Sequence, residues 1–220
     1  MNLKQTVFAC LLLTACQPTV DNTADTATTE QQPDYVALQH ELEEIYDLDQ
    51  GIRSIDWETI STPEASIAFS KKVMAIDSVN QTRVIPILEQ HGWLPKSKIG
   101  DKAASAIFYV VQHSNTATIE KYLPQMEELA KQGEASATDA AKMRDRLLMF
   151  QGKKQIYGTQ ATNSARVNGG YVIWPIEDAA NVNKRRKAVG FTTTVEEVAM
   201  QLRAVYDPNE KLPEHSNLRQ

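Results

Sequence analysis

Apolar side chains recur at helical spacing along most of the chain between residues 35 and 150. Leu38, Leu42 and Ile45, for example, are four and three residues apart, which places them on one face of a helix. The same spacing predicts helices at about 35–48, 63–90, 101–111, 118–132 and 136–150. Such helices bury their apolar faces by packing against one another, so a mainly α fold is predicted.

Residues that begin or end helices stand at the edges of these stretches. Pro63 suits the first turn of the second helix, and Asp101 can cap the third. The segment starting at Ser136 resembles a capping box and opens the fifth helix. Gly133 and Gly152 are placed to end the fourth and fifth helices.

The pattern changes after Gly152. Two strand-like segments, 155–160 and 171–174, flank the turn sequence Asn168-Gly169-Gly170 and predict a small β-hairpin. Two further helices are expected at about 179–189 and 195–206. The predicted architecture is an α-helical bundle with a small β-hairpin (around 155–174), in a single α-rich globular domain over 34–206. A flexible tail is expected over 207–220.

The first residues predict an export signal. One positive side chain, Lys4, precedes an apolar run over 7–13, which is far shorter than the roughly 20 residues of a membrane-spanning helix. The tetrapeptide Leu13-Thr14-Ala15-Cys16 then resembles the lipobox of bacterial lipoproteins. That resemblance implies cleavage before Cys16 and lipidation of its thiol, with the membrane as a partner through this anchor. The alternative is an ordinary signal peptide with a chance cysteine.

These features divide the N-terminal region into a lipoprotein signal peptide, 1–15, and a lipidated cysteine with a disordered tether, 16–33. The tether is rich in Thr, Asp, Gln and Ala and holds one large apolar residue, Val20, so it has nothing to pack. Gln17 follows the cysteine, where aspartate would resemble an inner-membrane retention signal. The expected location is the cell envelope, at the outer membrane facing the periplasm.

Charge and motif content exclude several classes of function. The formal net charge of −5 disfavours nucleic-acid binding, which needs a basic face. No phosphate loop, dinucleotide fingerprint or Gly-x-Ser-x-Gly motif is present, and we predict no cofactor. No histidine stands at metal-ligand spacing from another histidine or a cysteine, so no metal site is predicted. The basic run 184–187 is expected to be the exposed end of a helix.

Several short segments together resemble one bacterial family, the domain-of-unknown-function family numbered 6624. The family's hallmarks match a glutamine–histidine pair, an aspartate–arginine pair and the tetrapeptide Tyr157-Gly158-Thr159-Gln160 with a glutamine upstream. The matching segments are Asp77-Ser78-Val79-Asn80, His91-Gly92-Trp93, Gly100, Gln112-His113, Asp145-Arg146, Gln155 to Gln160 and Asn181 to Arg186. Asn115 stands where the family usually has an acidic residue. The resemblance implies no particular activity.

The polar residues of these segments are the candidate site. We predict that they bind a polar ligand or a protein partner: His113, Asp145, Arg146, Gln155, Tyr157, Thr159 and Gln160. A first alternative is an envelope hydrolase in which Asp145 orients His113 as a general base. A second is a purely structural lipoprotein, in which these side chains form a polar network that holds the hairpin to the bundle.

Overall fold

The structure is a computed structural model that describes residues 33–55, 60–163 and 170–213. The described residues belong to one compact unit that begins at Pro33. The predicted signal peptide and Cys16 lie outside the described residues, as do nearly all of the tether and the last seven residues of the predicted tail.

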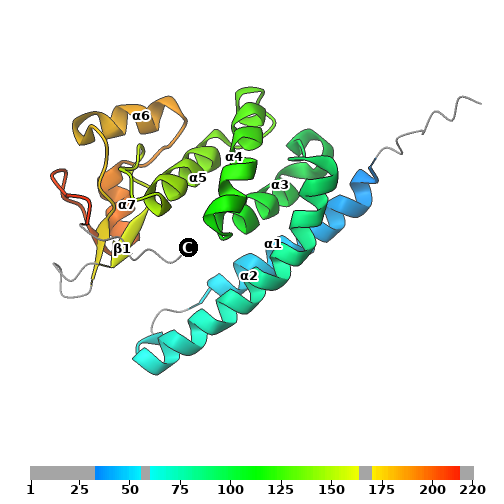
Figure 1. The fold of residues 1–220 in the computed structure, drawn as a ribbon, viewed down its shortest axis with the longest axis horizontal. Helices are drawn as coiled ribbons and strands as arrows, with labels where there is room; N and C mark the ends of the chain where they lie inside the picture. The colour runs from blue at the N-terminus through cyan, green and yellow to red at the C-terminus, as the bar shows by residue number, and fades with distance from the viewer. Residues whose placement is uncertain (1–32, 56–59, 164–169, 214–220) are drawn as a thin grey trace, which may run out of the picture. The chain divides into compact units, whose positions relative to one another are not determined.

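Five helices occupy the first two thirds of the unit, as the apolar spacing predicts (Figure 1). They are α1 (Tyr35–Arg53), α2 (Pro63–His91), α3 (Lys96–Gln112), α4 (Thr116–Lys131) and α5 (Ala137–Phe150). The mainly α fold class is therefore confirmed. None of the described helices is both long enough and apolar enough to span a bilayer.

Capping side chains begin most of these helices. Asp34, Thr62, Asn115 and Ser136 each accept hydrogen bonds from backbone N–H groups of the first turn. The start of α3 differs from the prediction: the helix begins at Lys96, and Gly100, with φ of +81°, joins two helical pieces. The predicted start at residue 101 is the beginning of the second piece.

The main core lies among the five helices. α1 and α2 run side by side in Figure 1, and both contribute buried residues to it. Its fully buried members come from every helix and include Leu42, Ile45, Val84, Ile99, Ile107, Val111, Ile119 and Met143. This packing fixes α1, α3 and the C-terminal third of α2 relative to one another.

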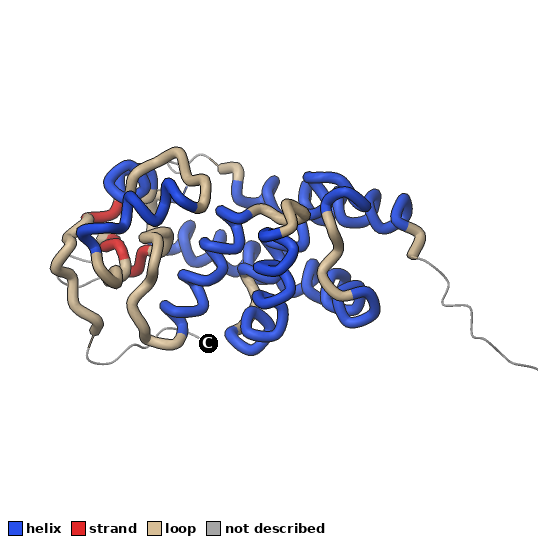
Figure 2. Tube along the Cα trace, turned by 90° about the horizontal axis from the view of Figure 1, so that it is seen from above, coloured by secondary structure: helices blue, strands red, loops and turns tan. Residues whose placement is uncertain are grey.

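A small sheet and three short helical segments follow. β1 (Ala161–Asn163) pairs antiparallel with β2 (Tyr171–Ile173), which confirms the hairpin. β3 (Ala204–Val205) lies parallel to β2, and Figure 2 shows the strands gathered together next to short helices. These helices are η3 (Ala179–Asn181), α6 (Val182–Ala188) and α7 (Val195–Gln201).

Three predictions for this region were wrong in detail. Gln155 to Gln160 is not a strand: only Gln155 forms a bridge, to Ile176, and the rest is a loop. The helix predicted over 195–206 ends at Gln201, because residues 204 and 205 pair with β2. The basic run is not a wholly exposed end, since Arg186 is 1% exposed.

Candidate functional site

A cleft of about 930 Å³ lies between the helices and the C-terminal segments. Its walls come from the end of α3, one face of α5, the start of β1, and the region from α6 to the end of α7. These segments are far apart in the sequence, and the packing of the C-terminal part onto the end of α5 brings them together.

The charge in the cleft has one sign. Four cationic side chains line it, from Lys142, Arg146, Arg186 and Arg203, and no aspartate or glutamate is among the described lining residues. Lys142 forms an ion pair with Asp139 at 2.8 Å. The cleft is therefore electropositive in a protein whose net charge is negative.

Arg186 forms part of the wall. Its Nε donates to the carbonyl of Thr193 at 2.8 Å, and its Nη1 donates to the carbonyl of Tyr157 at 2.8 Å. The guanidinium also lies over the ring of Phe191, 4.4 Å from its centroid. A buried arginine with these partners holds α6, the following loop and the 155–160 loop in place.

Arg146 has one ring contact, with Phe150 at 5.8 Å from its centroid, but no polar partner among the described residues. Within the described residues its guanidinium forms no hydrogen bond or ion pair, and its Nε is buried. Burial, together with the charge of Arg53, lowers the pKa of Arg146 from its ordinary value to about 10, while Asp77 acts in the opposite direction. Arg146 therefore remains charged at neutral pH, in a place that disfavours its charge.

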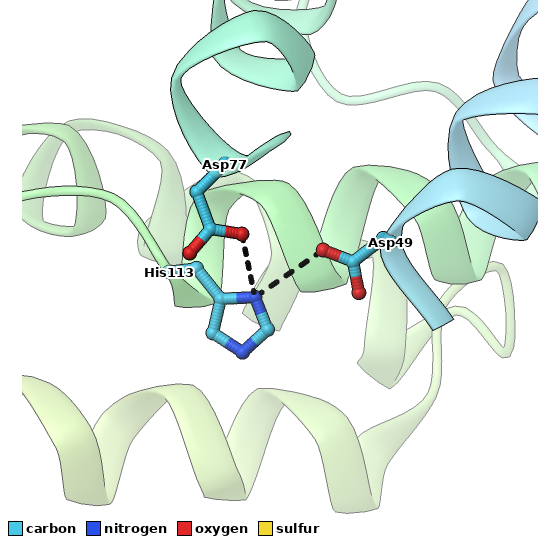
Figure 3. Close-up of side chains that lie close together, drawn as sticks. All are labelled: Asp49, Asp77 and His113. Atoms are coloured by element: carbon cyan, nitrogen blue, oxygen red, sulfur yellow. Dashed lines mark ion pairs between the residues drawn. The ribbon is translucent and has the colours of Figure 1, made fainter. Parts of the chain in front are cut away.

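His113 stands at the edge of the same cleft. It follows the last residue of α3, and its ring stacks on Tyr109 with centroids 6.3 Å apart. Its Nδ1 lies 3.5 Å from Oδ1 of Asp49 and 3.9 Å from Oδ1 of Asp77. Figure 3 shows both carboxylates on the Nδ1 side of the ring, whereas the other nitrogen, Nε2, points away from them.

Asp49 is fully buried and held in a fixed position. Arg53, one turn later on α1, bonds to its Oδ1 at 2.8 Å, and Gln50 donates to its Oδ2 at 2.7 Å. Burial raises the pKa of Asp49, but the interactions with His113, Arg53 and Gln50 outweigh burial and keep the pKa below 3.8. Asp49 is therefore a carboxylate at neutral pH and attracts a proton on the facing Nδ1.

Asp49, Asp77 and His113 also bring one potential metal-ligand atom each within 4.8 Å of one another. Arg53, however, binds Oδ1 of both carboxylates, which are the same oxygens that face His113. A metal ion would have to displace this guanidinium. We therefore assign the two carboxylates to Arg53 and His113 and assign no metal.

Asp145 has a different neighbourhood from His113. The side chain is fully buried, and its two oxygens accept hydrogen bonds from the backbone N–H groups of Ile156, Tyr157 and Thr159 and from the Thr159 hydroxyl. Burial raises its pKa, and these four donors oppose the increase. The carboxylate organises the 155–160 loop, and the structure does not pair it with His113.

Gln155, the first residue of the loop, holds it from within. Its Nε2 donates to the carbonyls of Gln160 and Trp174, and its Oε1 accepts from the backbone N–H groups of Thr159 and Gln160. Gly158, inside the loop, has φ of +70°, and an added Cβ would lie 2.6 Å from a side-chain carbon of Val195. The loop is thus specified both from within and by the residues around it.

The structure divides the predicted site residues into two groups. His113, Arg146, Thr159 and Gln160 line the cleft. Of the other three, Gln155 and Tyr157 belong to the loop beside the cleft, and Asp145 of α5 holds that loop. Tyr157 contributes backbone hydrogen bonds to Asp145 and Arg186 and a ring contact to Phe191. Although Asp145 and Arg146 are adjacent in the sequence, Asp145 bonds to the 155–160 loop and Arg146 lines the cleft.

Sequence reasoning missed Asp49 and Arg53 and did not single out Asp77. A signal for Asp49 was present, since it lies four residues after Ile45 and seven after Leu42, on the buried face of α1. A carboxylate on an apolar stripe needs a partner, and Arg53 is one turn further along the same helix. Asp77 stands likewise seven residues before buried Val84.

Unsatisfied polar atoms gather at the cleft. Oε1 of Gln112, Nδ1 of His113 and Nε of Arg146 are buried, and none has a hydrogen-bond partner in the described part of the chain. All three residues line the cleft. Buried polar groups are almost always paired in proteins, so Oε1 of Gln112 and Nε of Arg146 are available to a ligand, whereas Nδ1 of His113 faces the two carboxylates.

A search of the curated proteins found no match to this chain. A search of the solved structures found none either. One family model does match, over residues 36–209, which is more than half of the chain and nearly all of the described unit. The chain belongs to this family, the family of unknown function DUF6624.

Proposed function

We propose that the protein is a lipid-anchored protein of the cell envelope whose helical domain binds a small anionic ligand in the cleft. One observation carries the choice of an anion: four cationic side chains and no described acidic residue line a cleft of about 930 Å³. The size is typical of a site for a small molecule. A positive lining favours a ligand that carries phosphate, sulfate or carboxylate groups.

Arg146 is the residue on which we expect such a ligand to bind. Its charge is retained in a partly buried position without a hydrogen-bond partner among the described residues, so it holds unused donors. An anion would provide both the missing hydrogen bonds and the missing counter-charge. Thr159 and Gln160 line the same cleft as neutral polar groups.

The experiment is a calorimetric titration of the full-length chain with inorganic phosphate at low ionic strength. Arg146→Gln removes the charge and keeps a polar side chain of moderate length, so we expect at least tenfold weaker binding, since a charged hydrogen bond contributes about 1.5–3 kcal/mol. Lys71→Gln removes one charge from an exposed position on α2, outside the cleft, and is the matched control.

Binding that falls in Arg146→Gln and persists in Lys71→Gln supports the proposal. Equal binding by the two variants and the wild type would contradict it, because phosphate would then be attracted by overall charge or by another surface.

The anchor is proposed from the sequence Leu13-Thr14-Ala15-Cys16. With its thiol lipidated, Cys16 would hold the domain at a membrane, through the tether, in the periplasm at the outer membrane. The Cys16→Ser variant is expected to remain uncleaved or to leave the lipid-extractable fraction. Membrane fractionation and the mass of the intact protein test this, and a variant with unchanged mass and unchanged fractionation would refute the anchor.

A further inference from the structure

We propose that the cleft is an active site, in which His113 acts as the general base for the hydrolysis of a phosphoric diester. The inference rests on the proposed binding of an anion and adds a reaction to it. It begins with the position of His113, which has one ring edge against buried carboxylates and lines the cleft itself.

The carboxylates decide which nitrogen of His113 carries the proton in the neutral ring. Nδ1 is buried and faces Oδ1 of Asp49 at 3.5 Å and Oδ1 of Asp77 at 3.9 Å. A proton on Nδ1 is favoured there, which leaves the lone pair on Nε2, the nitrogen that points away from both carboxylates (Figure 3). In catalytic triads a carboxylate beside Nδ1 likewise holds the histidine in the tautomer whose Nε2 can accept a proton.

Asp49 is itself suited to this positioning role. Arg53 and Gln50 hold both of its oxygens, and its lowered pKa keeps it ionised. A fully buried carboxylate with these partners changes its position little when His113 gains a proton. The ion pair of Arg53 with both carboxylates also keeps the summed charge around the ring small.

The lining favours a phosphoric diester as the substrate. In such an ester the anionic group is also the reacting group, so the cation that binds it stabilises the charge that changes during the reaction. Arg146, unpaired and on the lining, is the group that we expect to contact the two non-bridging oxygens. Guanidinium groups bind phosphate oxygens in pairs.

Water is the expected nucleophile. No serine or cysteine is among the described lining residues, and two of the threonine hydroxyls there are already hydrogen bonded, Thr159 to Asp145 and Thr193 to Arg186. Hydrolysis would then need a base to remove a proton from the attacking water. His113 is the histidine of the lining and is placed to supply that base.

The step balances without a further reactant. Nε2 of His113 takes a proton from water, the water oxygen forms a bond to phosphorus, and the bond from phosphorus to the leaving oxygen breaks. The leaving oxygen then takes the proton from Nε2, which restores the neutral ring. One diester and one water give one phosphoric monoester and one alcohol.

The test uses the full-length chain with bis(p-nitrophenyl) phosphate and follows the release of p-nitrophenolate in the presence of a metal chelator. We expect His113→Asn to lose activity by about 100-fold or more, as is typical when a general base is removed. His40→Asn, at an exposed position of α1 outside the cleft, is the matched control and should keep the wild-type rate. Phosphate titration of His113→Asn shows whether its cleft is intact.

Two measurements separate catalysis from structural support. Added imidazole should restore part of the activity of His113→Ala, which a purely structural histidine would not allow. Asp49→Asn, which removes the carboxylate that faces Nδ1 and leaves the cleft lining unchanged, should lower kcat and shift its pH profile while KM changes little. His113→Gln serves as a second variant if His113→Asn does not fold.

Three results would overturn the inference. The first is a wild-type protein that binds phosphate and releases no p-nitrophenolate, which leaves the proposed anion binding intact. The second is a His113→Asn rate equal to the wild-type rate. The third is a rate enhancement over the uncatalysed reaction that is larger for the neutral ester p-nitrophenyl acetate than for the phosphoric diester. A wild-type protein that does not bind phosphate would instead refute the proposed function itself.

Discussion

Replacing Asp145 by alanine is expected to lower the free energy of unfolding by about 3–5 kcal/mol, a large part of the roughly 5–15 kcal/mol of a typical domain. Its carboxylate accepts hydrogen bonds from three backbone N–H groups and one hydroxyl in the 155–160 loop, and it is fully buried. Each buried donor left without an acceptor lowers the free energy of unfolding by about 1–3 kcal/mol. Water entering the vacated space would recover part of this, so the contributions do not simply add.

The Asp145→Asn variant sharpens the test. Asparagine offers one oxygen and an NH₂ group in place of two oxygens, and both oxygens of Asp145 face N–H donors. In either orientation the NH₂ group would meet a donor, so this variant should also lose several kcal/mol, on the order of half to all of the alanine effect.

Urea unfolding followed by circular dichroism measures the free energy of unfolding of both variants. Asp139→Ala is the control, since Asp139 is on the same helix and forms a surface ion pair with Lys142, and it should lose less than about 1 kcal/mol. An Asp145→Ala variant as stable as Asp139→Ala would show that the loop does not depend on this carboxylate.

The helices could be predicted because their information is local. Apolar residues three and four apart and capping side chains such as Ser136 act within one or two turns, and all five predicted helices are present. Local reasoning also explains the error at α3. Gly100 precedes the predicted start of the third helix, whereas the chain continues through it between two helical pieces.

The 155–160 loop shows why the rest could not be predicted. Its β-branched and aromatic residues, Ile156, Tyr157 and Thr159, are typical of a strand. Three of its N–H groups are nevertheless bonded to the carboxylate of Asp145, eleven to fourteen residues earlier. A single sequence does not show whether these N–H groups pair with a neighbouring strand or with a carboxylate from another element. The parallel pairing of β2 with β3, about thirty residues later, is long-range in the same sense.

The candidate site was predicted in part for a related reason. His113 and Arg146 were singled out and do line the cleft, but the carboxylate expected to orient His113 was Asp145. The carboxylates beside its ring come from α1 and α2, which precede it by 64 and 36 positions in the sequence. Spacing along one helix indicates that Asp49 is buried; the packing of α1 against α3 determines which residue it meets.

Replacing Arg146 by leucine is expected to stabilise the fold while it abolishes anion binding. The fold lowers the pKa of Arg146 from its ordinary value to about 10, so it disfavours the charged form. Because the folded-state pKa lies below the unfolded value and both lie above 7, this penalty is fully present at neutral pH. At about 1.36 kcal/mol for each pKa unit, and allowing for partial exposure, leucine should add about 1–3 kcal/mol to the free energy of unfolding.

Arg144→Leu is the matched comparison for this variant. Arg144 is also on α5, but its Nε donates to Glu127 at 2.9 Å, so its replacement removes an ion pair and should be neutral or slightly destabilising. Urea unfolding and phosphate titration of the two variants separate a functional arginine from a structural one. A residue that lowers stability and is needed for binding indicates a site, because natural selection for packing alone would not keep an unpaired guanidinium there. If Arg146→Leu were less stable than the wild type and still bound phosphate, Arg146 would instead be a structural residue whose partner lies outside the described part of the chain.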